Sequence, residues 1–191
     1  VFLRPSGNNP SWGQVLECWP VLPSGYSKLM IYETVAAVDL GSNSFRLQVG
    51  RVVDNQIYTL DSMKEPVRLA SGLTADKRLD IPAQARALDA LRRFGERLGG
   101  LDSGAVRVVA TNTLRVAKNA AEFLPQAEQA LGFPIEIIAG REEARLIYIG
   151  ASHSLPTVAH KRLVVDIGGG STEFIIGKRH DPQLMESLYM G

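Results

Sequence analysis

The sequence predicts an α/β protein with a mixed sheet, in which an antiparallel β-β-β meander is followed by an α-β-α-β-α succession. Three observations support this prediction. Runs rich in β-forming residues lie together early in the chain, segments with the helical spacing of apolar residues then alternate with short apolar strands, and a hairpin pattern restarts near the end. Because 45% of the 191 residues are hydrophobic, the chain can bury a sizeable core.

The predicted strands are runs of β-forming residues bounded by turn signals. They lie at residues 35–40, 45–53, 56–60, 106–110, 135–138, 163–167 and 173–176. Short turns join the first three, which therefore predict the meander. The last two restart the hairpin pattern after a polar connection, so they predict the start of a second copy of the fold.

Three segments predict helices. Asp80 can cap the first, whose apolar residues follow helical spacing. They are Ile81, Ala85, Leu88, Leu91, Phe94 and Leu98. Residues 111–131 predict a second helical segment, in which Asn119 with Glu122 resembles a further cap and Pro125 should break or kink the helix. The third helix is expected at residues 142–152.

Proline and glycine divide the chain into predicted domains. Residues 1–34 are interpreted as a loosely ordered leader, because these two residue types interrupt every periodic stretch there. The leader lacks the charged, apolar and small-residue regions of a secretory signal, so we do not infer export from it. A first domain is predicted at residues 35–153, and the beginning of a second, truncated domain at residues 154–191.

The composition excludes several classes of function. A formal net charge of +1 gives no overall field to attract nucleic acid or an anionic membrane, so we expect neither as a partner. Cys18 is the only cysteine, which excludes an internal disulfide framework and a cysteine-rich zinc site and is compatible with a reducing cytoplasm. No apolar run approaches the length of a membrane span.

One hairpin pattern occurs twice. A-V-D-L-G-S-N-S-F-R-L-Q-V-G from residue 37 and V-V-D-I-G-G-G-S-T-E-F-I-I-G from residue 164 share Asp, Gly, Ser and the closing Gly in register. Glycine and small polar residues at a hairpin tip let backbone N–H groups and a serine hydroxyl converge on phosphate oxygens. One such tip alone could equally be an ordinary tight turn, but the repetition favours phosphate binding. The predicted phosphate-binding residues are Gly41, Ser42, Asn43, Ser44, Gly168, Gly169, Gly170 and Ser171.

Carboxylates flank both loops. Asp39 and Asp166 end the strands that precede them, and each needs a magnesium ion, a water or a donor side chain between itself and a phosphate, because like charges repel. Glu173 follows the second loop and could, with Asp166, supply the sparse carboxylates that magnesium accepts while it retains waters. A cross-strand surface charge is an equally consistent interpretation of Glu173.

Two further sites could take part in chemistry. Arg115 follows T-N-T at a predicted strand-to-helix junction, where its guanidinium could hold a phosphate; the alternative is a pair with Glu122 or solvent. Glu142 and Glu143 stand at a helix start, where acids stabilise the helix dipole without a catalytic task. Alternatively, one of them faces the cleft lined by the two phosphate loops and acts as the general base for an attacking water, and the other is solvated.

Four motifs together suggest a family. They are A-A-V-D-L-G-S-N-S-F, V-V-A-T-N-T-L-R-V-A-K-N, P-I-E-I-I-A-G-R-E-E-A-R-L-I-Y and V-V-D-I-G-G-G-S-T-E-F-I-I-G. The motifs occur in this order from about residue 35 to residue 191. Over this range the chain closely resembles the exopolyphosphatase and guanosine pentaphosphate phosphohydrolase family. The resemblance implies the actin-like, ribonuclease-H-like fold, with two related domains around a cleft and a homodimer at full length. Because family members continue through the rest of the second domain, this chain alone is expected to be inactive.

The resemblance also implies residue roles. It makes Glu143 the catalytic base, Arg115 a catalytic phosphate-contacting residue, and Asp39, Asp166 and Glu173 candidate ligands of Mg²⁺ or another divalent cation. Water would attack a terminal phosphoryl group and release orthophosphate. The all-glycine second loop favours inorganic polyphosphate as substrate, since the guanosine pentaphosphate branch often has alanine at its third position. Alternatives are guanosine pentaphosphate hydrolysis, an ATP-dependent kinase, and a non-catalytic sensor that binds polyphosphate or guanosine tetraphosphate without turnover.

Overall fold

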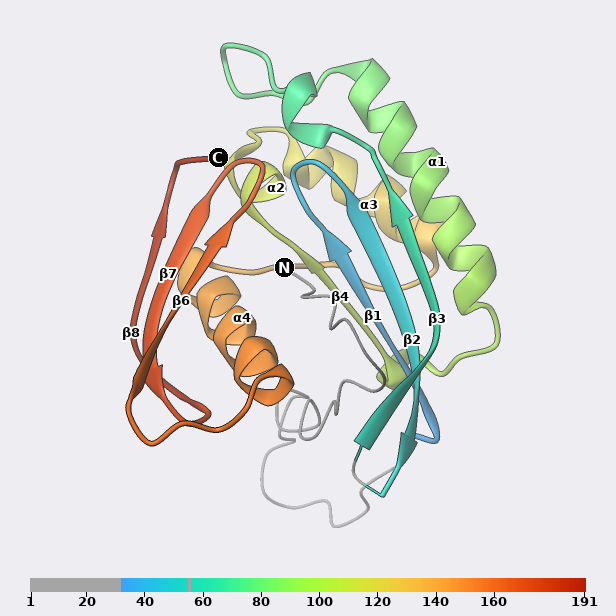
Figure 1. The fold of residues 1–191 in the computed structure, drawn as a ribbon. Helices are drawn as coiled ribbons and strands as arrows, with labels where there is room; N and C mark the ends of the chain where they lie inside the picture. Colours follow the sequence, from blue (N-terminus) through green and yellow to red (C-terminus); the bar gives the residue numbers. More distant parts are fainter. Residues whose placement is uncertain (1–31, 55) are drawn as a thin grey trace, which may run out of the picture.

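The computed structural model describes residues 32–54 and 56–191, shown from the N-terminal end in blue to the C-terminal end in red (Figure 1). Most of the predicted leader lies outside these residues, and Thr34, its last residue, opens the first strand. The elements are β1 (Thr34–Leu40), β2 (Phe45–Val53), β3 (Gln56–Glu65), η2 (Leu69–Gly72), α1 (Ile81–Leu98), η3 (Ser103–Ala105), β4 (Val106–Ala110), α2 (Asn112–Val116), α3 (Ala120–Leu131), β5 (Glu136–Ile137), α4 (Gly140–Ser154), β6 (Lys161–Ile167), β7 (Thr172–Lys178) and β8 (Asp181–Leu188).

The first sheet is mixed, with strand order β3-β2-β1-β4-β5. β1 runs antiparallel to β2, and β2 antiparallel to β3, so the predicted meander is confirmed. β4 lies parallel to β1 and to β5, as expected for strands joined through helices. β3 is longer than predicted and ends at Glu65.

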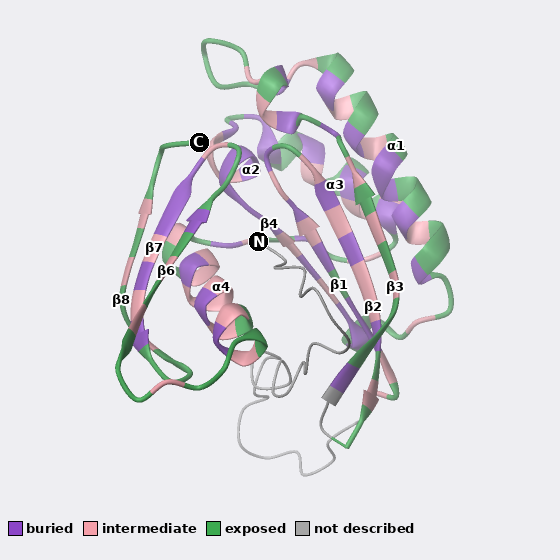
Figure 2. Ribbon diagram, in the orientation of Figure 1, coloured by how far each residue is buried: buried purple, intermediate pink, exposed green. Residues whose placement is uncertain are grey.

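Helices α1 and α3 pack beside each other and close the core of this sheet, where buried residues line the helices and the central strands (Figure 2). Asp80 caps α1 as predicted, since its Oδ1 accepts from the amide of Ala83 at 2.8 Å. The predicted buried face of α1 is partly wrong, because Ile81 is 81% exposed. Small residues fill that side of the core instead, namely Ala83, Ala87 and Ala90.

The helical segment after β4 is divided at residues 117–119 into α2 and α3. The predicted break at Pro125 is wrong, because α3 continues through it to Leu131. Asn119 does not cap α3 with its side chain. Its buried amide instead accepts from the backbone N–H of Leu79 at 2.8 Å and donates to the carbonyl of Leu79 at 3.0 Å, which ties the start of α3 to the entry of α1.

The second sheet is antiparallel, with strand order β6-β7-β8. Helix α4 covers one face of it, where Ala144 and Tyr148 of the helix and Ile175 of β7 form a separate small core. A Cβ atom added at Gly177 would lie 2.3 Å from Tyr148 Cζ, so glycine is required for the ring to pack on β7. The meander repeats the opening of the first sheet, while completion of a second copy of the fold and the domain boundary after residue 153 stay predictions.

Candidate phosphate-binding and catalytic site

The two predicted phosphate loops have the same construction. The first loop, residues 41–44, joins β1 to β2, and the second loop, residues 168–171, joins β6 to β7. A Cβ atom added at Gly41 would lie 2.9 Å from the carbonyl oxygen of the last serine of its loop, and one added at Gly168 would lie 3.0 Å from its counterpart. The repeat in sequence is therefore a repeat in backbone geometry, and each leading glycine permits a close approach of backbone to backbone.

The structure brings the two loops into direct contact, near the C-terminal end of the chain in Figure 1. A Cβ atom added at Gly169 would lie 2.4 Å from Asn43 Nδ2. One added at Gly170 would lie 2.5 Å from Asn112 Nδ2 and 3.0 Å from Ser42 Oγ. The consecutive glycines of the second loop thus admit the side chains of the first loop and of α2.

The peptide groups of the first loop have a fixed orientation. The carbonyl oxygen of Ser42 accepts from Ala70 N at 3.0 Å, and that of Asn43 accepts from Arg68 N at 2.8 Å. Since the N–H and C=O of one planar trans peptide point in opposite directions, the amides of Asn43 and Ser44 point away from residues 68–70. These amides are available for an anion on the opposite side of the loop.

In the second loop, the amide of Gly168 donates to the carbonyl of Ser171 at 2.9 Å. Gly168 therefore serves the turn itself, and its amide is occupied. Within the described residues, the amides of Gly169 and Gly170 donate no backbone hydrogen bond. The second loop can direct these two N–H groups at a phosphate.

Two residues of α2 belong to the loop junction and were not singled out from the sequence. Thr113 Oγ1 donates to Ser42 Oγ at 2.7 Å in a buried contact. Asn112 is 7% exposed, and its buried Oδ1 has no hydrogen-bond partner within residues 32–54 and 56–191. A buried acceptor without a partner costs about 1–3 kcal/mol, so this oxygen needs a donor such as a water or a bound molecule. The sequence signal for Asn112 and Thr113 is the T-N-T motif that precedes Arg115.

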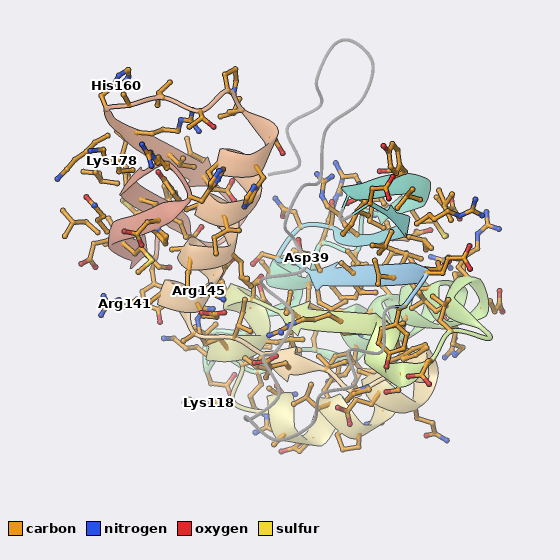
Figure 3. The ribbon with its side chains drawn as sticks, turned by 90° about the horizontal axis from the view of Figure 1, so that it is seen from below. Asp39, Lys118, Arg141, Arg145, His160 and Lys178 are labelled. Atoms are coloured by element: carbon orange, nitrogen blue, oxygen red, sulfur yellow. The ribbon has the colours of Figure 1, made fainter. Side chains whose placement is uncertain are left out.

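The predicted carboxylates gather next to the junction. Asp166 and Glu173 are cross-strand partners on β6 and β7 and are 8% and 1% exposed. Glu173 Oε1 accepts from Ser187 Oγ of β8 at 2.9 Å, so its interpretation as a surface charge is wrong. Figure 3 shows Asp39 between the two sheets. Burial and the charge of Asp166 raise the pKa of Asp39 to about 6, although Arg46 opposes the shift.

Arg115 and Glu143 form a partly buried ion pair beside these carboxylates. Arg115 Nη1 donates to Glu143 Oε2 at 3.2 Å and to the carbonyl of Ile138 at 2.8 Å. Burial and the charges of Glu173 and Asp39 raise the pKa of Glu143 to about 7, although Arg115 opposes the shift. A carboxylate with a pKa near neutrality is suited to accept a proton from water at physiological pH.

The alternative positions of the two glutamates are now distinguished. Glu142 pairs with Arg145 at 2.7 Å, and this hydrogen bond lowers its pKa. Glu142 therefore does not belong to the cluster of acidic residues, whereas Glu143 interacts with its members Glu173 and Asp39. The alternative pairing of Arg115 with Glu122 is wrong, since Glu122 pairs with Arg78 at 3.0 Å.

No group of three or more His, Cys, Asp or Glu side chains in the described part of the chain is arranged to hold a metal ion. Magnesium is commonly bound through only one or two carboxylates, with waters and substrate phosphates as the other ligands. Asp166 and Glu173, adjacent on paired strands, provide such a donor set beside the junction, and Asp39 lies close enough to Asp166 for their charges to interact. The residues fit magnesium, and their role as ligands stays a prediction.

The paired glycine loops and the adjoining acidic residues thus form one candidate site in an α/β protein. The chain belongs to the Ppx/GppA phosphatase family, whose model matches residues 48–191. This result confirms the resemblance seen in the sequence.

Individual relatives agree with this membership. The chain is 47% identical over 156 residues to a guanosine-5'-triphosphate,3'-diphosphate pyrophosphatase of Vibrio cholerae serotype O1, over 82% of this chain and 31% of that protein. An exopolyphosphatase structure from Cytophaga hutchinsonii matches with a TM-score of 0.78 and 30% identity over 83% of this chain and 51% of its own. The PPX-GPPA enzyme of Aquifex aeolicus matches with a TM-score of 0.73 and 31% identity, over 83% of this chain and 52% of its own.

These matches confirm the predicted actin-like α/β fold class. They also show that the chain spans about a third of the Vibrio relative and about half of the two solved structures. The activity and substrates of the whole protein are therefore proposals.

Proposed function

We propose that the full-length protein is a magnesium-dependent exopolyphosphatase, which hydrolyses the terminal phosphate from inorganic polyphosphate and releases orthophosphate. The observation that supports it most is the contact between two loops of matching geometry beside the Arg115–Glu143 pair. Hydrogen-bond donors for a phosphate and a candidate base would thus belong to one site.

Binding would begin at the loop junction. The amides of Asn43, Ser44, Gly169 and Gly170 would donate to the terminal phosphate. Asn43 now lies against Gly169, so it must move aside to admit an anion between the loops. This movement would also bring a donor to the buried oxygen of Asn112, in the form of a water or a protonated phosphate oxygen.

Glu143 would accept a proton from the attacking water, and Arg115 would hold the carboxylate in place and offset negative charge on the phosphoryl group. Asp166 and Glu173, with Asp39, would hold magnesium, which when bound neutralises charge on the phosphate oxygens. The P–O bond to the next phosphate breaks, and the products are orthophosphate and a polyphosphate shorter by one unit.

Guanosine pentaphosphate is the second candidate substrate. The Vibrio relative, at 47% identity, favours it, whereas the all-glycine second loop and the match to the Cytophaga exopolyphosphatase favour polyphosphate. Both reactions use the same attack on a terminal phosphate, so the site serves either. A sensor would bind polyphosphate or guanosine tetraphosphate at the same loops without turnover.

The test compares phosphate release by the full-length protein from long-chain polyphosphate and from guanosine pentaphosphate, with magnesium present. We expect faster release from polyphosphate. Faster release from guanosine pentaphosphate would assign the second activity instead. Binding of either compound with no release would identify a sensor.

Location and assembly are separate proposals. No helix in the described residues is long and apolar enough to cross a membrane. A cytoplasmic location and a homodimer follow from the family resemblance, and size-exclusion chromatography of the full-length protein tests the second.

A further inference from the structure

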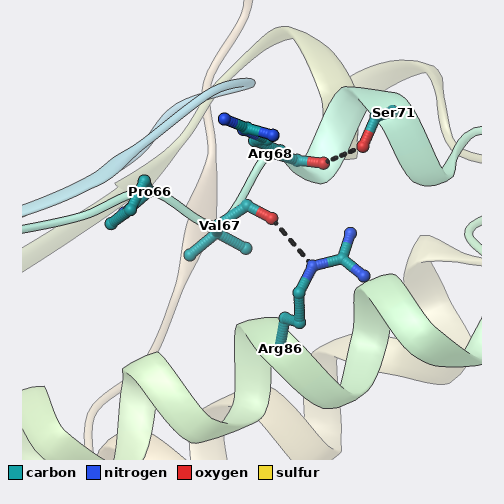
Figure 4. A pocket seen from close by; sticks show the side chains of 5 residues that line it. All are labelled: Pro66, Val67, Arg68, Ser71 and Arg86. Atoms are coloured by element: carbon teal, nitrogen blue, oxygen red, sulfur yellow. Dashed lines mark hydrogen bonds between the residues drawn. The ribbon is translucent and has the colours of Figure 1, made fainter.

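A second cationic site lies behind the first phosphate loop. A pocket with a volume of about 390 Å³ is formed between the segment that follows β3 and helix α1 (Figure 4). It is lined by Pro66, Val67, Arg68, Ser71 and Arg86. Two of its five lining residues carry a guanidinium group, and none carries a carboxylate.

Hydrogen bonds position the Arg86 side chain and the Arg68 backbone. Arg86 Nε donates to the carbonyl of Val67 at 3.1 Å, which leaves its two terminal nitrogens for another acceptor. The carbonyl of Arg68 accepts from Ser71 Oγ at 2.7 Å, and Arg68 itself has a left-handed backbone with φ 51°. This local turn fixes the point from which the Arg68 side chain leaves the chain.

Neither arginine forms an ion pair with a carboxylate within the described residues. The other arginines of α1 behave differently, because each has an acidic partner: Arg92 with Asp89, Arg93 with Glu65 and Arg97 with Asp61. The pocket therefore concentrates positive charge that no carboxylate of the described residues pairs with, whereas the other arginines of α1 are paired.

The pocket is directly connected to the first phosphate loop. The amide of Arg68 donates to the carbonyl of Asn43 at 2.8 Å, and the amide of Ala70 donates to that of Ser42 at 3.0 Å. The pocket therefore adjoins the carbonyl side of the first loop, opposite the amides of Asn43 and Ser44. A polyanion with its terminal phosphate at the junction would reach the pocket around the edge of this loop.

We propose that the Arg68–Arg86 pocket is a second anion subsite, which binds a phosphate group of the substrate other than the one hydrolysed. The inference rests on the proposed function. Guanidinium groups bind phosphate oxygens through paired charge-assisted hydrogen bonds, and Arg68 and Arg86 supply two such groups. The bound group is an internal phosphate of polyphosphate or the 3'-diphosphate of guanosine pentaphosphate.

The test uses the full-length protein with Arg68→Ala, Arg68→Lys and, as the matched control, Arg92→Ala. Steady-state kinetics would be measured with long-chain polyphosphate, tripolyphosphate and guanosine pentaphosphate. Loss of one charge-assisted contact should raise KM about tenfold with little change in kcat. The rise in KM should be confined to long-chain polyphosphate or to guanosine pentaphosphate, which tells the two phosphate sources apart. Arg68→Lys should raise KM less than Arg68→Ala does.

Direct binding separates this inference from the proposed hydrolase. Fluorescent long-chain polyphosphate would be titrated into Glu143→Gln protein with and without Arg68→Ala. Weaker binding on loss of Arg68 supports the subsite even if the intact protein releases no phosphate. Equal KM values and equal binding in Arg68→Ala and Arg92→Ala proteins would overturn the subsite even if hydrolysis is confirmed.

Discussion

Arg115 Nη1 donates to Glu143 Oε2 at 3.2 Å, so a cation from α2 lies against a carboxylate from the first turn of α4. The same nitrogen donates to the carbonyl of Ile138, just before α4 begins. The pair therefore joins the first sheet, through α2, to the helix that covers the second sheet. It also sets the charge state of the proposed base.

Replacement of Arg115 by alanine should shift the pH dependence of hydrolysis. Arg115 lowers the pKa of Glu143 against burial and the charges of Glu173 and Asp39, so its loss should raise that pKa above about 7. Because the reaction needs the ionised base, the acidic limb of the kcat/KM profile should move to higher pH. Rates of the full-length protein measured between pH 5 and 9 check this, and an unmoved limb would contradict it.

Glu143→Gln should stabilise the protein at pH 8 while it removes activity. The folded pKa of about 7 lies above the ordinary 4.5, so the protonated carboxyl favours folding. That stabilisation is complete below about pH 4.5 and is lost as the pH rises through 7. We expect the variant to gain roughly 1–3 kcal/mol at pH 8, and much less at pH 5. Thermal unfolding at both pH values measures the difference, and an equal effect at both would contradict the assigned pKa.

Gly170→Ala should weaken phosphate binding, because the added Cβ would lie 2.5 Å from Asn112 Nδ2 and 3.0 Å from Ser42 Oγ. Both neighbours are buried, so the loops would have to shift apart. We expect the KM for polyphosphate to rise about tenfold or more. Gly150→Ala is the matched control, since no atom lies within 4 Å of a Cβ added there. Equal KM values in the two variants would show that the loop contact has no role in binding.

Asn119→Ala should destabilise the first sheet's core without an effect on the site. The Asn119 amide accepts from and donates to the backbone of Leu79 in a buried position, and alanine would leave both backbone groups without that partner. The expected loss is about 2–4 kcal/mol in the free energy of unfolding. Urea denaturation measures it, and a loss below about 0.5 kcal/mol, the range of a neutral surface substitution, would contradict the role of this clamp.

The loops were the most predictable part of the site. Their small residues and shared register are sequence patterns, and the close approaches at Gly41 and Gly168 explain why the pattern repeats. The choice between Glu142 and Glu143 was not predictable in the same way. Both stand in the first turn of α4, and only the packing of that helix on β7 and β8 decides which one meets Arg115.

The errors in the fold have a common physical origin in tertiary contacts. The alanines of α1 are buried because α3 approaches closely, as shown by the 2.7 Å between a Cβ added at Gly95 and the carbonyl oxygen of Leu131. β8 was not predicted, because Pro182 and Glu186 interrupt its weak β pattern and its pairing with β7 forms the strand. Asn119 was interpreted as a cap, although its partner Leu79 is forty residues away in sequence.

The most direct test of the account is phosphate release from long-chain polyphosphate by the full-length protein with magnesium, for the wild type, Glu143→Gln and the control Glu142→Gln. Since general base catalysis contributes about a hundredfold or more, Glu143→Gln should lose at least that factor in kcat while Glu142→Gln keeps nearly all of it. Turnover by Glu143→Gln at the wild-type rate would contradict the assignment of Glu143 as the base.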